Sequence, residues 1–148
     1  MVEKKIAVGA DHAGFELKEK IKLFLGELGY EVVDFGANST DSVDYPLIAK
    51  ALAIEVVKKN PERGILICGT GIGMSVAANK IKGVIAATCH DIATAKLARQ
   101  HNNSNILTFG GRITSLELAK EIVKVWLETD FEGGRHQRRI QEIRDLER

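Results

Sequence analysis

Short runs of β-prone residues alternate with amphipathic stretches along the whole chain. In these stretches apolar residues recur at helical spacing: residues 15–28 predict one helix that ends at Gly29, and residues 47–57 predict another, opened by Asp44-Tyr45-Pro46. Strands rich in Val, Ile and Ala on both faces are typical of a parallel sheet that helices cover on both sides. Right-handed crossovers then give a three-layer, doubly wound α/β fold. Its five parallel strands are expected at residues 5–8, 30–35, 64–68, 84–89 and 105–109.

Composition limits the classes of partner. With 148 residues, we expect one domain over residues 1–148 that buries its own core. The 21 basic and 20 acidic residues nearly cancel, so neither nucleic acid nor an anionic membrane is an expected partner. The absence of a secretory signal at the start and of long apolar runs favours a reducing, cytoplasmic setting. No metal is expected, because Cys68 has no Cys or His at ligand spacing and Cys89 adjoins only His90 and Asp91.

The segment after Asp130 differs from the rest of the chain. The break at residues 131–134 precedes a strongly charged helix, expected at residues 135–146. Its apolar stripe consists only of Ile140, Ile143 and Leu146, which is too narrow to anchor a terminal helix firmly in its own core. Two interpretations stay open: the helix packs on a second subunit, or it is a solvated surface helix.

The run from Ile65 to Ser75 carries the clearest chemical signal. Three aliphatic residues lead to Cys68, and alternating glycines follow at once, which predicts a buried strand, an anion-binding turn and a helix N-terminus. Backbone N–H groups and a helix dipole favour thiolate over thiol. A lone cysteine after aliphatic residues is also a common core residue, so Cys68 is either a reactive thiol or a packing residue.

Other polar residues stand next to the remaining predicted strands. In an open parallel sheet, ligands bind beyond the carboxyl ends of the strands. Asp11 and His12 follow the first strand, Arg112 follows the fifth, and His101 and Asn102 precede the fifth. We expect all of these to share one edge of the sheet with Cys68. Taken singly, Asp11 is equally a candidate helix N-cap, and His12 an exposed residue at a helix start.

Nucleotide and phosphatase motifs fit this chain poorly. Residues 9–14 have the glycine frame of a P-loop without its Lys and Ser/Thr, and no arginine closes a phosphatase loop after Cys68. A dinucleotide site stays open as an alternative, with Asp91 near the spacing of a ribose-binding acid. The chemistry that these residues still suit is proton transfer, with the thiol as the base and backbone N–H groups holding an oxyanion. Arg135 and Arg139, one turn apart, suit a sugar phosphate or form a solvated basic stripe.

Five motifs follow one another from the first predicted strand to the last predicted helix. They are Gly9-Ala10-Asp11-His12-Ala13-Gly14, Cys68-Gly69-Thr70-Gly71-Ile72-Gly73, His101-Asn102, Phe109-Gly110-Gly111-Arg112, and Gly133-Gly134-Arg135-His136 with Arg139. Together they resemble the motif set of the type B ribose-5-phosphate isomerases. That family also includes isomerases of galactose 6-phosphate and allose 6-phosphate.

The resemblance implies an activity and a role for each matching residue. The implied reaction interconverts ribose 5-phosphate and ribulose 5-phosphate through an enediolate, in the pentose phosphate pathway, with no metal and no cofactor. Cys68 would remove the C2 proton, His101 would protonate the ring oxygen with help from Asp11, and Thr70 would assist near the C1 and C2 oxygens. Backbone N–H groups of the turn would hold the enediolate, those of Gly69, Thr70, Gly71, Ile72 and Gly73. The remaining sugar and phosphate contacts would come from Asp11, His12, Asn102, Arg112, Arg135 and Arg139.

The resemblance also implies an assembly and leaves two questions open. It implies a homodimer, or a dimer of dimers, in which the thiol loop of one subunit meets the histidine and arginines of the other. Leu47 departs from the acidic residue that many members have after Tyr45-Pro46, which leaves the shape of one pocket edge open. A six-carbon aldose 6-phosphate is an alternative substrate, and a sugar-phosphate sensor without catalysis is an alternative function.

Overall fold

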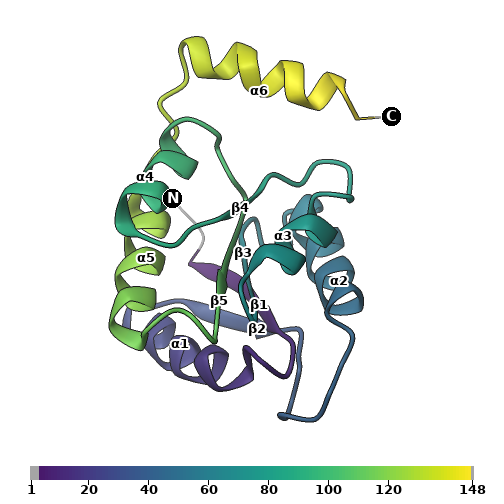
Figure 1. The fold of residues 1–148 in the computed structure, drawn as a ribbon. Helices are drawn as coiled ribbons and strands as arrows, with labels where there is room; N and C mark the ends of the chain where they lie inside the picture. The colour runs from purple at the N-terminus through teal and green to yellow at the C-terminus, as the bar shows by residue number, and fades with distance from the viewer. Residues whose placement is uncertain (1–3, 148) are drawn as a thin grey trace.

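Five parallel strands form one sheet at the centre of the computed structural model, which describes residues 4–147 (Figure 1). The strands lie in the order β2-β1-β3-β5-β4. Every pairing between neighbours is parallel, as the β-prone runs predicted. The strands are β1 (Lys5–Ala10), β2 (Glu31–Asp34), β3 (Gly64–Cys68), β4 (Ala86–Thr88) and β5 (Ile106–Gly110).

Helices cover both faces of the sheet and complete the Rossmann-like, three-layer fold (Figure 1). One face carries α1 (Phe15–Glu27), α4 (Ile92–Gln100) and α5 (Leu116–Glu128), and the other carries α2 (Tyr45–Val57) and α3 (Ile72–Ala78). The crossovers through α1 and α4 step toward the β2 end of the sheet, whereas those through α2 and α3 step toward β4. Right-handed crossovers in opposite directions lie on opposite faces, so the handedness accounts for the two layers.

The core has two halves, divided by the sheet. All five residues of β3 are buried, and they alternate between the halves: Ile65 and Ile67 face α1, α4 and α5, whereas Leu66 and Cys68 face α2 and α3. A strand buried on both faces reads as a continuous apolar run, which is why β3 was predicted at its observed bounds.

β2 and β5 differ from their predicted bounds by one residue at each end, and two other strands differ by more. The first was expected to end at residue 8, but β1 continues to Ala10, because Gly9 and Ala10 pair with Leu66 and Ile67 of β3. The fourth was expected over residues 84–89, but β4 has only three residues. It is an edge strand that pairs with β5 alone, so fewer of its residues find ladder partners.

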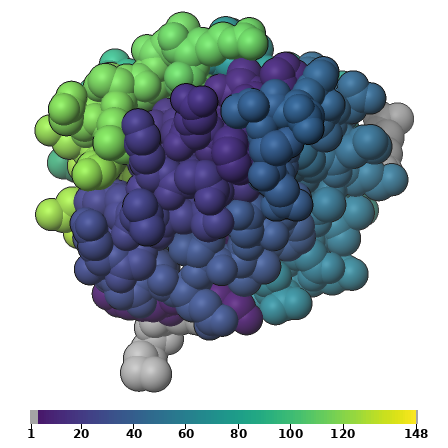
Figure 2. Space-filling model, turned by 90° about the horizontal axis from the view of Figure 1, so that it is seen from below, coloured from purple at the N-terminus to yellow at the C-terminus, as the bar shows by residue number. Residues whose placement is uncertain are grey.

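The sheet has a topological switch between β1 and β3. From this point the chain connects outward in both directions, and the carboxyl ends of the two strands open the crevice in which such folds bind ligands. Asp11 directly follows β1, and Cys68 ends β3. Figure 2 shows this end from below, where segments from the first third of the chain lie beside green segments from the β5–α5 region.

The last helix, α6 (Arg135–Asp145), lies apart from the three layers, beyond the opposite end of the sheet (Figure 1). Of its apolar stripe, Ile140 is 3% exposed, whereas Ile143 is 41% and Leu146 is 77% exposed. The rest of the chain therefore covers one of the three residues, and packing on a second subunit stays a prediction. None of the helices between residues 4 and 147 combines the length and apolarity needed to cross a bilayer.

Candidate active site

Cys68 lies at the end of β3, where the chain turns into α3. Its Sγ accepts a hydrogen bond of 3.1 Å from the backbone N–H of Gly71, and the residue is only 5% exposed. Gly71 is the N-cap of α3 with φ +86°, and a Cβ there would lie 2.7 Å from the backbone of Phe109. A glycine is therefore required to bring this N–H to the sulfur. The thiol is buried, as the packing interpretation expects, and it also faces a backbone donor, as the reactive interpretation expects.

The end of β5 closes over the same turn. The N–H of Gly111 donates to the carbonyl oxygen of Cys68 at 2.7 Å, and the N–H of Arg112 donates to that of Gly69 at 3.1 Å. The Arg112 side chain lies over Gly69, since a Cβ on that glycine would be 3.5 Å from Nη1. Thr70 is exposed, and its Oγ1 accepts from the N–H of Ile72 at 3.2 Å. The turn therefore offers a cation, a hydroxyl and backbone donors close to the thiol.

Asp11 and His12 are held in fixed orientations at the end of β1. The carboxylate of Asp11, 6% exposed, accepts from the N–H groups of Ala13 at 2.9 Å and Gly14 at 3.1 Å. Gly14 is the N-cap of α1, so the N-cap alternative for Asp11 is wrong: this side chain caps the preceding turn. Nδ1 of His12 accepts from the N–H of Val43 at 3.2 Å, which places the proton of the neutral ring on Nε2.

Tyr45 is a site residue that sequence reasoning missed. A Cβ on Gly73 would lie 2.7 Å from Cζ of Tyr45, so the phenol ring packs directly on the glycine turn. The sequence signal was present, but Tyr45-Pro46 was interpreted only as the start of a helix. Leu47, the departure from the family pattern, is 67% exposed in the first turn of α2.

His101 belongs to a second group of polar residues, together with Glu132 and His136. Its Nε2 lies 3.4 Å from Oε1 of Glu132, and its ring stacks on that of His136 with centroids 4.2 Å apart and planes 12° apart. Partial burial and the charges of His101 and Arg135 hold the pKa of His136 below its ordinary value. The sequence motifs predicted no role for Glu132 or His136. The two residues are four positions apart, on either side of the start of α6, and this spacing brings their side chains together.

The expectation of one shared edge is wrong for His101 and Asn102. His101 caps the C-terminus of α4, which carries the chain from the carboxyl edge of the sheet back to the amino edge. Cys68 pairs with Gly110, at the far end of β5. A strand of five residues spans about 16 Å, so the thiol and the imidazole of one chain lie at opposite ends of the sheet. Arg135 and Arg139, both exposed on α6, lie at the His101 end.

Neither group is arranged to hold a metal or a dinucleotide. The ligand atoms of His101, Glu132 and His136 lie within 4.8 Å of one another, but the lone pairs of stacked rings run parallel and do not converge on one ion. Asp91, the candidate ribose-binding acid, caps α4 by accepting from the N–H of Thr94 at 2.7 Å. That hydrogen bond holds the pKa of Asp91 below its ordinary value.

Comparisons with known proteins point to one family. A family model described as Ribose/Galactose Isomerase matches residues 6–143. The chain is 50% identical to ribose-5-phosphate isomerase B of Escherichia coli over 97% of both chains. It is 42% identical to D-erythrulose-4-phosphate isomerase of Pectobacterium atrosepticum, covering 93% of this chain and 91% of that one. The structure is also similar to the crystal structure of a ribose 5-phosphate isomerase from Thermotoga maritima, with a TM-score of 0.95 and 50% sequence identity. The match covers 98% of this chain and 100% of that one.

Proposed function

Because the chain belongs to the ribose/galactose isomerase family, we propose that it interconverts ribose 5-phosphate and ribulose 5-phosphate by proton transfer. The observation that carries this proposal is the hydrogen bond from the N–H of Gly71 to Sγ of Cys68. Cys68 ends β3 at the topological switch, where this fold binds ligands, and the hydrogen bond is made to its nucleophilic or basic sulfur atom. Arg112 beside Gly69 adds a positive charge for an anionic substrate.

Cys68 is the base in this proposal. An N–H directed at sulfur interacts more favourably with a thiolate than with a thiol, and the N-terminus of α3 acts in the same direction. The thiolate removes the proton from C2 of the open sugar, and the electron pair moves onto the carbonyl oxygen to give the enediolate. Backbone N–H groups between Gly69 and Gly73 hold this anion, with Thr70 beside the C1 and C2 oxygens. A proton passes from the C2 hydroxyl to the C1 oxygen, and delivery of the proton from the Cys68 thiol to C1 then gives the ketose and restores the thiolate.

His101 is the acid that opens the sugar ring, and it acts on a site of a second chain. A sugar phosphate is far shorter than the distance of about 16 Å along β5 that separates the two groups in one chain. We therefore propose a homodimer, alone or paired into a tetramer. Its site joins Cys68, Asp11, His12 and Arg112 of one chain to the residues at the His101 end of the other, namely His101, Asn102, Arg135 and Arg139. Arg135 and Arg139 bind the phosphate.

The compartment and the substrate complete the proposal. Cys68 and Cys89 are both free thiols, which suits a reducing cytoplasm. Ribose 5-phosphate is the substrate that the E. coli relative and the Thermotoga structure favour by name. The Pectobacterium relative is named for a four-carbon sugar phosphate, so sugars of other lengths are the second candidate.

A proton NMR time course in heavy water with a chelator tests the reaction. We expect ribose 5-phosphate to yield ribulose 5-phosphate, with deuterium entering at the carbon that exchanges. A folded protein that binds the sugar but neither converts it nor exchanges its C2 hydrogen would be a sensor, and the proposal would fail. Conversion of D-erythrulose 4-phosphate or allose 6-phosphate with no conversion of ribose 5-phosphate would reassign the substrate.

Mixing two inactive variants tests the shared site. We expect Cys68→Ala and His101→Asn, refolded together in equal amounts, to recover about a quarter of the parent activity, because half the dimers are mixed and each has one intact site. The matched control refolds Cys68→Ala with Asp11→Asn. Both changes lie on the same side of the site, so no recovery is expected. Absence of recovery in the first mixture would place the whole site in one chain.

A further inference from the structure

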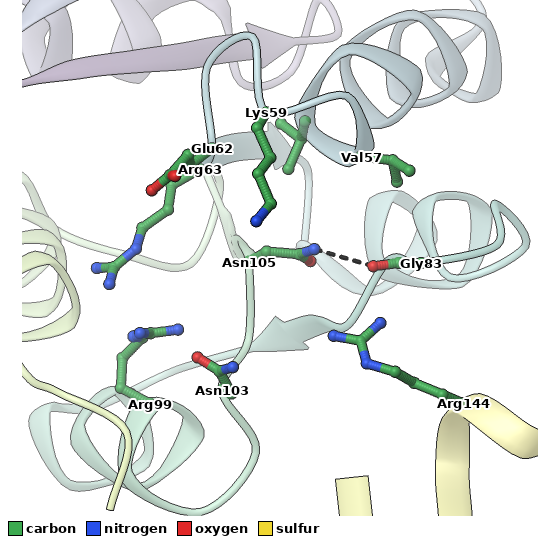
Figure 3. A pocket seen from close by; sticks show the side chains of 10 residues that line it. Val57, Lys59, Glu62, Arg63, Gly83, Arg99, Asn103, Asn105 and Arg144 are labelled. Carbon is green, nitrogen blue, oxygen red and sulfur yellow. Dashed lines mark hydrogen bonds between the residues drawn. The ribbon is translucent and has the colours of Figure 1, made fainter. Parts of the chain in front are cut away.

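A cavity of about 470 Å³ opens at the amino edge of the sheet, at the opposite end from Cys68 (Figure 3). It lies between the α2–β3 turn, the loop before β4, the α4–β5 turn and α6. Its volume falls in the range of small-molecule sites, roughly 300–1,000 Å³. The isomerase site as proposed does not use this space.

The lining of this cavity is strongly cationic. Lys59, Arg63, Arg99 and Arg144 contribute positive charges, and Glu62 is the one carboxylate among the lining residues. Figure 3 shows Lys59, Arg99 and Arg144 arranged around Asn105, on different sides of the same space. Within residues 4–147, the ion pairs involve none of the four cations. The cavity therefore carries an excess of positive charge, which Glu62 in its lining and the nearby carboxylates of Asp130 and Glu147 offset only in part.

The two inner guanidinium groups are fixed by neutral partners. Arg99 is only 5% exposed, and it donates from Nη1 to the carbonyl oxygen of Ser104 at 2.6 Å and from Nε to that of Thr129 at 3.3 Å. Arg63 donates from Nη1 to the carbonyl oxygens of Trp126 at 3.4 Å and Leu127 at 3.3 Å. Over the described part of the chain, Nη2 of neither arginine donates to another protein group. The Nη2 groups of Arg63 and Arg99 are therefore held in position and can donate hydrogen bonds to a ligand.

Electrostatics agrees with this geometry. Burial and repulsion by Arg63 lower the pKa of Arg99 to about 10, and burial lowers the pKa of Arg63 as well. Both groups remain charged at neutral pH. Arg63 and Arg99 repel each other and are partly desolvated. A multivalent anion bound on their solvent side stabilises both charges.

We propose that this cavity is a second anion-binding site, which takes a phosphorylated metabolite through its phosphate group. Guanidinium groups are suited to bidentate contacts with phosphate oxygens, and Lys59 and Arg144 lie at the more accessible side, where the ligand enters. Asn103, at the α4–β5 turn, adds an amide to the lining for a polar part of the same ligand.

Calorimetric titration with pyrophosphate tests the site. The titration uses the full chain carrying Arg135→Gln and Arg139→Gln, so that the proposed substrate-phosphate contacts are absent. We expect saturable binding in this background and at least tenfold weaker binding when Lys59→Gln and Arg144→Gln are added. Arg99 and Arg63 are left unchanged, because their carbonyl partners tie them to the fold.

The matched control adds Lys58→Gln and Arg138→Gln instead, which remove the same charge from neighbouring exposed positions that do not line the cavity. Binding in this control is expected to match the background. Equal weakening in the control and in the cavity variant would show a general charge effect and overturn the proposal. Absence of saturable binding in the background would overturn it as well. Neither result depends on whether the protein isomerises ribose 5-phosphate.

Discussion

The two ends of the sheet present their polar residues in contrasting ways. At the carboxyl end, Cys68 is 5% and Asp11 is 6% exposed, and both side chains accept backbone N–H groups. At the amino end, the side chains of His101 and Glu132 are 39% and 50% exposed; they lie 3.4 Å apart, and both contact the ring of His136. The thiol end is thus built within one chain by buried contacts, whereas the histidine end lies open.

This contrast suits the proposed dimer, in which the histidine end meets a second chain. Side chains held by several buried hydrogen bonds are already oriented for chemistry, since rearranging them would leave buried polar groups unpaired. A half-exposed contact between an imidazole and a carboxylate contributes little and orients both groups weakly. In the proposed dimer, the open histidine end would gain its final geometry on the thiol end of a partner.

Replacing the thiol should give the largest effect. Cys68→Ala is expected to lower turnover by about 10²–10⁴-fold, because it removes the proposed general base. Binding of ribose 5-phosphate should change little, as measured by steady-state kinetics and calorimetry. The matched control is Cys89→Ala, which alters the other buried cysteine and should keep the parent turnover. Normal turnover of Cys68→Ala would make this thiol a packing residue.

The next largest effect concerns the ion pair between buried Lys18 and the partly exposed Asp34, which lies at the same end of the sheet as the thiol. Nζ of Lys18, with a side chain 0% exposed, lies 2.8 Å from Asp34 and donates to the carbonyl oxygen of Ala37 at 2.6 Å. Asp34→Asn leaves this ammonium with only the carboxylate of Glu19, 3.4 Å away, and is expected to lower the free energy of unfolding by about 1.5–3 kcal/mol, measured by urea titration. Asp41→Asn, at an exposed position of the same loop, is the control and should change stability little.

The pH dependence of the same pair can be predicted. Burial alone would raise the pKa of Asp34, but hydrogen bonds from Lys18 and Lys22 outweigh it and hold the pKa below the ordinary value of 3.8. The resulting stabilisation is present above pH 3.8 and is lost as the pH falls through the lower folded value. Asp34→Asn should therefore flatten the loss of stability measured between about pH 5 and pH 2. An unchanged acid profile would contradict this assignment.

A smaller effect is expected from crowding the glycine turn. A Cβ on Gly73 would lie 2.7 Å from Cζ and 2.9 Å from the hydroxyl of Tyr45, so Gly73→Ala must displace the phenol ring. We expect a loss of about 1–3 kcal/mol in stability and a fall in kcat/KM. Gly26→Ala is the control: a Cβ there meets nothing within 4 Å in α1, and the change should stabilise the helix. Unaltered kinetics for Gly73→Ala would separate Tyr45 from the site.

The smallest effect should come from the exposed pair at the histidine end. Glu132→Gln is expected to change the free energy of unfolding by less than about 1 kcal/mol. Because the Glu132 carboxylate raises the pKa of His136, its removal should lower that pKa further, measured by NMR titration of the ring protons. Glu142→Gln, on an exposed position of α6, should leave the pKa unchanged. A large loss of stability would show that the histidine end is as firmly built as the thiol end.

Local signals in the chain predicted the elements and the thiol turn. Helical periodicity located α1 and α2, and the apolar run before Cys68 located β3, since each pattern reflects contacts of neighbouring residues. The bounds of β1 and β4 were wrong, because pairing depends on strands distant in sequence. Tyr45 was missed for the same reason: its contact with Gly73 spans the α2–β3 unit and leaves no periodic signal.

By itself the sequence determined that strands and helices alternate in a parallel fold, that a thiol stands before a glycine turn, and which family the motifs resemble. The tertiary structure decided which of these residues share an end of the sheet. It placed Asp11 and Cys68 on either side of the switch between β1 and β3, and it moved His101 to the opposite edge. The spacing of residues along the chain does not show which of them share an end of the sheet, because strand order and crossover direction arise only when the sheet assembles.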